Sequence, residues 1–206
     1  MRMYLIRHSI TYGNTLGRYI GTTDEPLCQE GVELLQKKIY PGVDAVYASP
    51  LKRCTETAEI IYPEKPVHII EDLAECDFGL FENKNYLELD GNAEYQRWID
   101  SGGTLPFPGG ESQEIFRSRC LRGFERVASD CIREAMKSAA LVVHGGTIMS
   151  ILDGFAVPHE DFYFWQVKNA RGYEIELDEQ QWNKGKREVS VCGKLRVLAA
   201  DARKQL

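Results

Sequence analysis

Two apolar segments that each end on a histidine constrain the fold of this chain most strongly. Residues 2–7 and 141–144 have the length and apolar character of buried strands, and they end at Arg7-His8 and at His144. In an open α/β sheet, ligands bind just beyond the carboxyl ends of the strands. The sequence therefore predicts that both histidines lie at one edge of a sheet, where Arg7 adds a fixed positive charge suited to an anion.

The rest of the chain alternates strand and helix patterns. The sequence predicts helices over residues 29–39, 50–61, 112–135 and 147–153, and strands over residues 45–48, 67–70, 162–167 and 171–177. This alternation is typical of an α/β fold, a three-layer α/β/α sandwich with a mostly parallel central sheet. Residues 73–110 interrupt the alternation and predict short helices in an excursion from the sheet. Residues 188–198 predict further strands at one edge.

Length and composition favour one domain. The chain has 206 residues, of which 43% are hydrophobic, and this is enough for a full core. We therefore expect a single domain over residues 1–206, with a helical excursion at about 80–110 and a C-terminal extension at about 180–206.

Charge and cysteine usage exclude several partners. The net charge of −6 argues against broad binding to nucleic acid or to an anionic membrane surface. The six cysteines are scattered without Cys-x-x-Cys spacing, which is typical of reduced thiols. No apolar run has the length of a signal-peptide core or a membrane span. We expect a cytoplasmic protein.

Arg7 and His8 are the first candidates for chemistry. An arginine presents a planar fork of donors that matches phosphate or carboxylate oxygens. A neutral imidazole is a competent nucleophile toward phosphorus, and the adjacent guanidinium disfavours protonation of His8. The alternative is a histidine that only ends a strand.

Three further residues are candidates to hold the same anion. Arg53 follows a strand end and lies in the first turn of a predicted helix, where free backbone donors already favour an anion. Asn14 could donate from its amide, and His144 is followed by glycines that allow close approach of a ligand. The alternatives are a solvated helix residue, a turn residue and a buried histidine, respectively.

A phosphoryl transfer to His8 also requires an acid for the leaving group. Glu75 and Asp77 follow the predicted strand at 67–70, and a nearby dianion would raise the pKa of either carboxyl group. These residues alone do not choose between the two.

Together, these segments resemble the histidine phosphatase superfamily, which includes the phosphoglycerate mutases. The resemblance covers about residues 2–178 and runs in the family's order. The matching segments are Arg7-His8-Ser9-Ile10-Thr11-Tyr12-Gly13-Asn14, Gly21-Thr22-Thr23-Asp24-Glu25-Pro26-Leu27, Ser49-Pro50-Leu51-Lys52-Arg53-Cys54-Thr55-Glu56-Thr57-Ala58, Glu75 with Phe78-Gly79 and Glu82, Gly110-Glu111-Ser112, and His144-Gly145-Gly146.

The resemblance implies a phosphoglycerate mutase-like fold and a role for each candidate. His8 would be the phosphorylated nucleophile, and the alignment selects Glu75 over Asp77 as the acid and later the base for water. The remaining roles implied are phosphate binding by Arg7, Asn14, Arg53 and His144, and possible backbone contacts to substrate from Gly21 and Gly145. The chemistry of this family requires no metal or other cofactor.

Three positions depart from the family pattern. Ser9 stands in place of a glycine and is expected to narrow the space beside the phosphate. Ile10 replaces a polar residue that usually lines the pocket. Cys28 stands where Ser or Thr often caps the next helix, which should weaken that cap by about 1 kcal/mol at most.

The substrate class follows from the length of the excursion. Only 35 residues separate Glu75 from Glu111, and Lys84 and Arg97 are the cations among them. The segment therefore offers few positive charges to bind a second acidic group on the substrate. This favours a phosphatase over a mutase, and residues 106–112 resemble α-ribazole phosphatases of cobalamin assembly. The aromatic residues that could wall a pocket for a flat base are Phe81, Tyr86, Tyr95, Trp98 and Phe107.

Other readings stay open at this point. The aromatic residues also fit ordinary packing, and the whole pattern also fits a sugar-phosphate phosphatase or a mutase. A non-catalytic phosphate-binding scaffold is an alternative from another class, since fold does not determine function. The expected partner is a small-molecule phosphomonoester, and the protein is expected to be a monomer or a homodimer.

Overall fold

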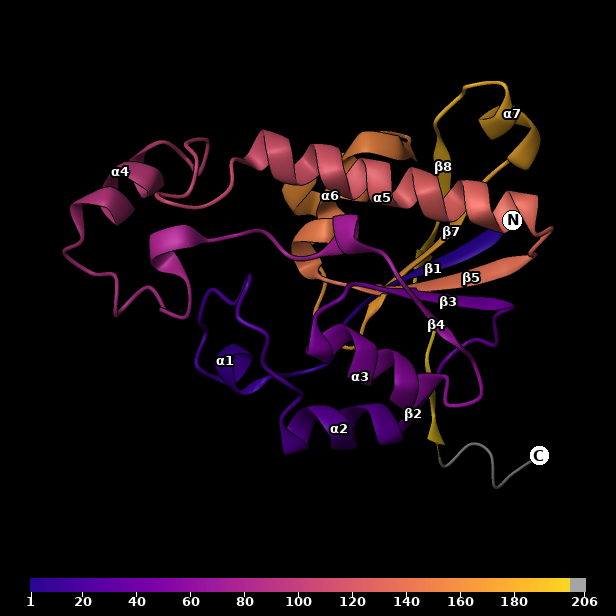
Figure 1. The fold of residues 1–206 in the computed structure, drawn as a ribbon, viewed down its shortest axis with the longest axis horizontal. Coiled ribbons are helices and arrows are strands. Elements are labelled where there is room, and N and C mark those ends of the chain that lie inside the picture. The colour runs from indigo at the N-terminus through magenta and orange to yellow at the C-terminus, as the bar shows by residue number, and fades with distance from the viewer. Residues whose placement is uncertain (201–206) are drawn as a thin grey trace.

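The computed structural model describes residues 1–200, and a seven-stranded sheet lies at its centre with helices on both faces (Figure 1). The strand order is β4-β3-β5-β1-β7-β8-β6. The strands are β1 (Arg2–Arg7), β2 (Lys38–Ile39), β3 (Ala45–Ala48), β4 (Val67–Ile69), β5 (Ser138–Val143), β6 (Ala156–Val157), β7 (Gly172–Glu176), β8 (Val189–Lys194) and β9 (Leu198–Ala199). Only β7 is antiparallel to its neighbours in this sheet, so the expected mostly parallel sheet is confirmed.

Helices α5 and α6 cover one face of the sheet, and α2 and α3 cover the other, which confirms the three-layer arrangement (Figure 1). The helices are α1 (Tyr12–Thr15), α2 (Gln29–Gln36), α3 (Lys52–Ile61), α4 (Ala93–Asp100), α5 (Gln113–Arg133), α6 (Gly145–Phe155) and α7 (Glu179–Asn183), with 3₁₀ turns η1 (Glu71–Leu73), η2 (Gly79–Phe81) and η3 (Phe162–Trp165). No helix within residues 1–200 has both the length and the apolar character needed to cross a bilayer.

The long helix α5 forms where its apolar stripe predicts it. Ser112 accepts a hydrogen bond from the Ile115 backbone and so caps the first turn, a contribution of about 1 kcal/mol. Phe124 and Val127, one helical turn apart, are completely buried against the sheet. This packing anchors the end of the chain segment that leads into β5.

The pairing of β1 with β5 determines where the chemistry lies. These strands are parallel neighbours, and Arg7 is paired with Val143. The next residue on each strand, His8 and His144, therefore emerges at the same edge of the sheet, and the His8 backbone donates to the Val143 carbonyl at 2.9 Å. The central expectation from the sequence, two histidines at one sheet edge, is confirmed.

The expected strand at 162–167 is wrong. Phe162–Trp165 forms the 3₁₀ turn η3, closed by a hydrogen bond from the Phe164 backbone to the Asp161 carbonyl. The aromatic run suggested a buried strand, but Tyr163 and Phe164 are 62% and 61% exposed. Trp165 alone turns into the core from this segment, and its indole donates to the Glu160 carbonyl.

The helix expected at 29–39 ends earlier, and the loop after β1 contains an unexpected short helix. Helix α2 ends at Gln36 because the following residues, Lys38–Ile39, pair with β9. Helix α1 forms because Thr11 and Asn14 cap each other's backbone amides reciprocally. Of the predicted C-terminal extension at about 180–206, residues 201–206 lie outside the described part of the chain.

The excursion between η1 and α5 contains η2 and α4 and projects at one end of the molecule (Figure 1). It has its own apolar cluster, which joins Phe81 and Phe107 to Phe116 of α5. The excursion therefore packs on the same end of the sheet at which His8 and His144 emerge.

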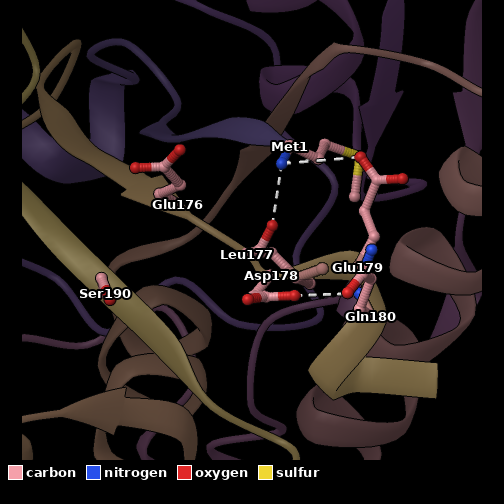
Figure 2. Close-up of a pocket in the computed structure, with 7 residues that line it drawn as sticks. All are labelled: Met1, Glu176, Leu177, Asp178, Glu179, Gln180 and Ser190. Atoms are coloured by element: carbon pink, nitrogen blue, oxygen red, sulfur yellow. Dashed lines mark hydrogen bonds and ion pairs between the residues drawn. The ribbon is translucent and has the colours of Figure 1, made fainter. Parts of the chain in front are cut away.

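The opposite end of β1 carries a different, acidic pocket. Figure 2 shows the ammonium group of Met1 donating to the Leu177 carbonyl at 2.8 Å, with the Glu179 carboxylate 3.6 Å away. Glu176 and Asp178 also line this pocket. A six-residue strand separates it from His8, and its carboxylates repel an anion, so it is not the phosphate site.

Candidate active site

His8 is buried and held in one orientation. Its Nδ1 lies 2.6 Å from the Ser9 carbonyl oxygen, so Nδ1 carries the proton and donates. Nε2 is then the unprotonated nitrogen. Burial, followed by the positive charges of Arg53 and Arg7, holds the pKa of His8 well below its usual range. These effects favour the neutral imidazole at neutral pH, and burial contributes more to the shift than the neighbouring arginines.

His144 lies edge-on to His8, with the two ring centres 5.2 Å apart. Its Nε2 is 2.7 Å from the Ser49 hydroxyl, and Cys54 packs against the ring. Burial, followed by the positive charge of Arg53, holds the pKa of His144 well below its usual range. These effects favour the neutral form of His144 in the free protein.

Arg7 and Arg53 both lie beside the two histidines, and each has a donor without a partner. Arg7 donates from Nη1 to the Val167 carbonyl, and its Nε lies against Gly145. The Nε of Arg7 and the Nε of Arg53 are buried and have no hydrogen-bond partner within residues 1–200. Since a buried unsatisfied donor costs roughly 1–3 kcal/mol, these atoms mark a place that an anion would stabilise.

Arg53 also organises the loop that carries Gly21. Its guanidinium is fully buried and donates to the backbone carbonyls of Ile20, Gly21 and Thr23 at 2.8–3.2 Å. Helix α3 begins just before Arg53 without a side-chain cap. The sequence predicted the anion-facing role of Arg53 but not this second role.

Asn14, Gly145 and Gly21 differ in what they offer a ligand. The side-chain oxygen of Asn14 accepts from Thr11 and from Asn169, which leaves its amide nitrogen free to donate. Gly145 is the first residue of α6 and lies against Arg7. Both backbone groups of Gly21 are already engaged, by Glu82 and by Arg53, so a substrate contact there remains only a prediction.

Of the two candidate carboxyl groups, Glu75 is the one that lies against the start of α6, at Gly146, two residues after His144, and the charges of Arg7 and Arg53 act on it. Burial nevertheless raises the pKa of Glu75, against the lowering effects of the Cys76 backbone and these arginines. A Cβ at Gly146 would lie 2.8 Å from the Glu75 carboxylate, so a larger residue there would displace the Glu75 side chain. Asp77 instead accepts from the Gly79 backbone at 2.9 Å.

A salt bridge that the sequence did not predict fastens the acid loop, residues 72–77. Arg119 of α5 binds both carboxylate oxygens of Glu111 at 2.8 Å. The same guanidinium donates to the carbonyls of Asp72, Ala74 and Glu75 at 2.6–3.1 Å. The only sequence signal was an arginine next to the buried stripe of α5.

A cavity of about 250 Å³ opens on the Glu75 side of the histidines. We call it the leaving-group pocket. Its walls are mostly aromatic and come from the excursion, α5 and η3. The residues that line it are Tyr19, Glu75, Cys76, Phe78, Trp98, Phe107, Gln113, Phe116, Arg117, Gly146, Met149, Phe162 and Tyr163.

Of the aromatic residues expected to wall such a pocket, Trp98 and Phe107 line it. They stack on each other with ring centres 5.0 Å apart. Phe81 and Tyr95 pack behind them, and Tyr86 is exposed. The alternative prediction from the sequence, that these aromatic residues serve ordinary packing, is therefore confirmed for Phe81 and Tyr95.

The three departures from the family pattern have structural accounts. The Ser9 hydroxyl donates to the Gly31 carbonyl of α2, so it turns toward the helix. Ile10 lines a separate groove on the Arg7 side. Cys28 precedes α2 and makes no side-chain cap, as expected.

Comparison with known proteins agrees with this geometry. The family model described as Histidine phosphatase superfamily (branch 1) matches residues 3–188. The adenosylcobalamin/alpha-ribazole phosphatase of Escherichia coli (strain K12) is 26% identical over 189 residues, covering 87% of this chain and 92% of that protein. The 2,3-bisphosphoglycerate-dependent phosphoglycerate mutase of Rhizobium etli is 32% identical over 167 residues, covering 74% and 78%.

Among solved structures, the alpha-ribazole phosphatase from Shigella flexneri has the same fold. It superposes with a TM-score of 0.78 at 24% identity and covers 97% of this chain and 96% of that one. The family model spans most of the chain, from the β1 strand through the excursion to the start of β8. The chain is therefore an enzyme of the histidine phosphatase superfamily, as its motifs predicted.

Proposed function

We propose that this enzyme is a metal-independent phosphomonoesterase that forms a phosphohistidine at His8, with α-ribazole 5′-phosphate as its substrate in cobalamin nucleotide-loop assembly. The main support for the proposal is that Arg7 and Arg53 each have a buried Nε donor without a hydrogen-bond partner, beside a neutral His8. A phosphate monoester supplies oxygen acceptors for both donors and an electrophilic phosphorus for the imidazole.

In the first step, His8 Nε2 attacks phosphorus while the bond to the alcohol oxygen breaks. The Nδ1–H bond to the Ser9 carbonyl stabilises the positive charge that the ring acquires. Arg7, Arg53, the Asn14 amide and His144 hold the phosphoryl oxygens, and the start of α6 at Gly145 adds backbone donors. These contacts strengthen as charge spreads over the transferring group.

Glu75 completes the first step and starts the second. Its raised pKa favours the protonated acid, which gives its proton to the departing alkoxide. The resulting carboxylate then removes a proton from water, which attacks the phosphohistidine and releases orthophosphate. Both steps need Glu75 on the leaving-group side of phosphorus, and Glu75 lines the leaving-group pocket.

The leaving-group pocket supports an alcohol with a flat apolar base. Its walls are mostly aromatic, and among the residues that line it within 1–200 Arg117 is the one cation. Arg117 is paired with Asp153 at 2.9 Å, although its own buried Nε has no hydrogen-bond partner within residues 1–200. Lys84 and Arg97 of the excursion do not line the pocket and bond elsewhere, to the Leu80 carbonyl and to Glu94.

A phosphoglycerate mutase must bind a carboxylate and a second phosphate beside the reacting group. The leaving-group pocket has no unneutralised cation among its lining residues for that purpose. The relationship to the Rhizobium etli mutase therefore does not extend to this subsite. A simple sugar phosphate would leave the aromatic walls without a partner.

The proposal extends to partners and location. We propose that the enzyme acts on a small phosphomonoester as a monomer or homodimer in the cytoplasm and binds neither nucleic acid nor membranes. The net charge of −6 supports this proposal, as do six unpaired thiols, of which four are buried.

A kinetic comparison of substrates tests the assignment. Burying roughly 100 Å² of aromatic base should contribute about 2.5 kcal/mol, or about fiftyfold in kcat/KM over ribose 5-phosphate. Equal kcat/KM for the two substrates would reject α-ribazole 5′-phosphate but leave the phosphatase intact. Conversion of 3-phosphoglycerate to 2-phosphoglycerate at a rate above hydrolysis would favour the mutase instead.

A further inference from the structure

A second cavity, of about 920 Å³, lies on the Arg7 side of the histidines, away from Glu75. It opens where the end of β1 meets α2, β2 and the end of β8. We call it the basic groove, because every charged residue that lines it within residues 1–200 is a cation. These cations are Arg7, Lys38, Lys168, Arg171 and Lys194.

The charges of the basic groove are not neutralised by the protein. None of its five cations takes part in an ion pair within residues 1–200, although acidic residues outnumber basic ones in the chain by 31 to 25. The Lys38 ammonium donates only to the Ala170 carbonyl, at 3.3 Å. Grouping unpaired cations in one cavity is costly unless an anion joins them.

The pKa of Lys38 reflects both its burial and one neighbouring cation. Burial, followed by the charge of Arg171, lowers the pKa of Lys38 to about 8. The Tyr40 hydroxyl bonds the same Ala170 carbonyl, and the other charged residues that line the groove within residues 1–200 are cations. Within residues 1–200, no carboxylate lines the groove to raise the pKa of Lys38 again.

The basic groove and the leaving-group pocket share no lining residue. A substrate with its phosphoryl group at His8 directs its leaving group toward Glu75, because that acid must protonate the leaving oxygen. The groove lies on the other side, behind Arg7 and Asn169. It is therefore free to hold a second molecule while substrate is bound.

We propose that the basic groove binds a separate small-molecule polyanion, a compound that carries two or more phosphate groups. The cavity has the size of a ligand pocket, and Ile10, Leu34 and Leu195 give it apolar surface for the body of such a compound. The four cations other than Arg7, which is assigned to the substrate phosphate, exceed what one phosphate needs. The proposal does not depend on the phosphatase assignment, because it concerns only binding.

Calorimetry with inorganic tripolyphosphate tests the proposal, with orthophosphate present at a concentration that saturates the phosphate site. We expect saturable binding with one site per chain. The double variant Lys168→Glu/Lys194→Glu, at two exposed positions, should weaken it by at least about tenfold, because each change removes a charge-assisted contact. Lys65→Glu/Lys137→Glu makes the same charge change at exposed positions outside the groove and should leave the affinity unchanged.

Lysine labelling with an amine-reactive reagent gives a second, site-resolved measurement on the unaltered protein. Tripolyphosphate should protect Lys38 and Lys194 but not Lys65. A nucleoside triphosphate that protects the same lysines at lower concentration would identify a nucleotide as the ligand, and equal protection would identify the phosphate chain alone.

Three results would overturn the proposal: no saturable binding by the unaltered protein, equal weakening in both double variants, or no protection of Lys38. Hydrolysis of p-nitrophenyl phosphate, measured on the same samples, keeps the two proposals apart. An inactive protein that binds tripolyphosphate in the groove would refute only the phosphatase, and an active protein that does not bind it would refute only the groove.

Discussion

Arg119 holds Glu111 through two hydrogen bonds of 2.8 Å and, with its remaining donors, fixes three carbonyls of the acid loop. One of these carbonyls belongs to Glu75 itself. The proposed acid is thus positioned by a helix residue that does not reach the phosphate. This relationship makes Arg119 a positioning residue whose effect can be separated from catalysis.

Arg119→Met should lower kcat by about 10- to 100-fold, because a displacement of the acid by about 1 Å costs that much. KM should change little, and the alkaline limb of the pH profile should shift as Glu75 becomes more solvated. Arg133→Met is the matched control, since Arg133 lies on the same helix and pairs with Asp130 at the surface, away from the acid loop. Equal losses in both variants would show a merely structural role.

His8→Ala should reduce turnover by about 10,000-fold or more, as expected for loss of a nucleophile. Acid-quenched samples of the unaltered enzyme with labelled substrate should contain phosphohistidine, and samples of the variant should not. His68→Ala removes an exposed histidine of β4 and should be fully active. Undiminished phosphate release by His8→Ala would end the proposed mechanism.

Glu75→Gln should separate the two chemical steps. A p-nitrophenolate leaving group needs no proton, so the variant should release about one equivalent of it per site in a burst and then turn over slowly. An alkyl phosphate should give no burst. Asp77→Asn should retain nearly full activity, because Asp77 bonds the Gly79 backbone. The reverse pattern would make Asp77 the acid.

Trp98→Ala should raise KM for α-ribazole 5′-phosphate by about tenfold, through loss of roughly 1.4 kcal/mol of apolar contact. The KM for ribose 5-phosphate should stay within about twofold, since it lacks the base that meets the indole. Leu87→Ala alters an exposed residue of the same excursion and serves as the control. A uniform loss on both substrates would indicate collapse of the excursion.

The buried histidines predict a pH-dependent stability. His8 stays neutral in the folded state below pH 6.5, whereas the unfolded chain takes up a proton there, so stability falls as pH decreases below 6.5. Between pH 7.5 and 5.5 the unaltered protein should lose about 1 kcal/mol more than His8→Asn, measured by urea unfolding at each pH. Glu75 acts in the opposite direction, but it is present in both proteins and cancels. Equal losses would mean that His8 titrates normally when folded.

The sequence was sufficient for the central layout of this site. Strand pattern and motif order predicted the positions of His8, His144 and Arg53, because parallel strands must present their ends at one edge. Departures arose where tertiary contacts outweighed local pattern. Phe162–Trp165 has the composition of a strand, yet only Trp165 finds a place in the core.

The supporting interactions were beyond prediction for a related reason. Arg119 and Glu111 are eight residues apart, but their bonds to the acid loop depend on how α5 lies against η1. The basic groove likewise combines Lys38, Lys168 and Lys194 from segments that nothing in the sequence relates. Charge alone does not reveal which cations will lie together.

The contacts of residues 20–23 limit how the substrate specificity of this enzyme can be re-engineered. A Cβ at Gly21 would lie 2.0 Å from the Cys76 carbonyl, and Glu82 binds the amides of both Gly21 and Thr23. The excursion, through Glu82, and residues 20–23, which Arg53 binds, are thus joined and should move as one unit. An excursion transplanted from a relative would need a carboxylate at position 82, and position 21 would have to remain glycine. Without both, the loop that Arg53 binds would lose its hydrogen bonds or be displaced.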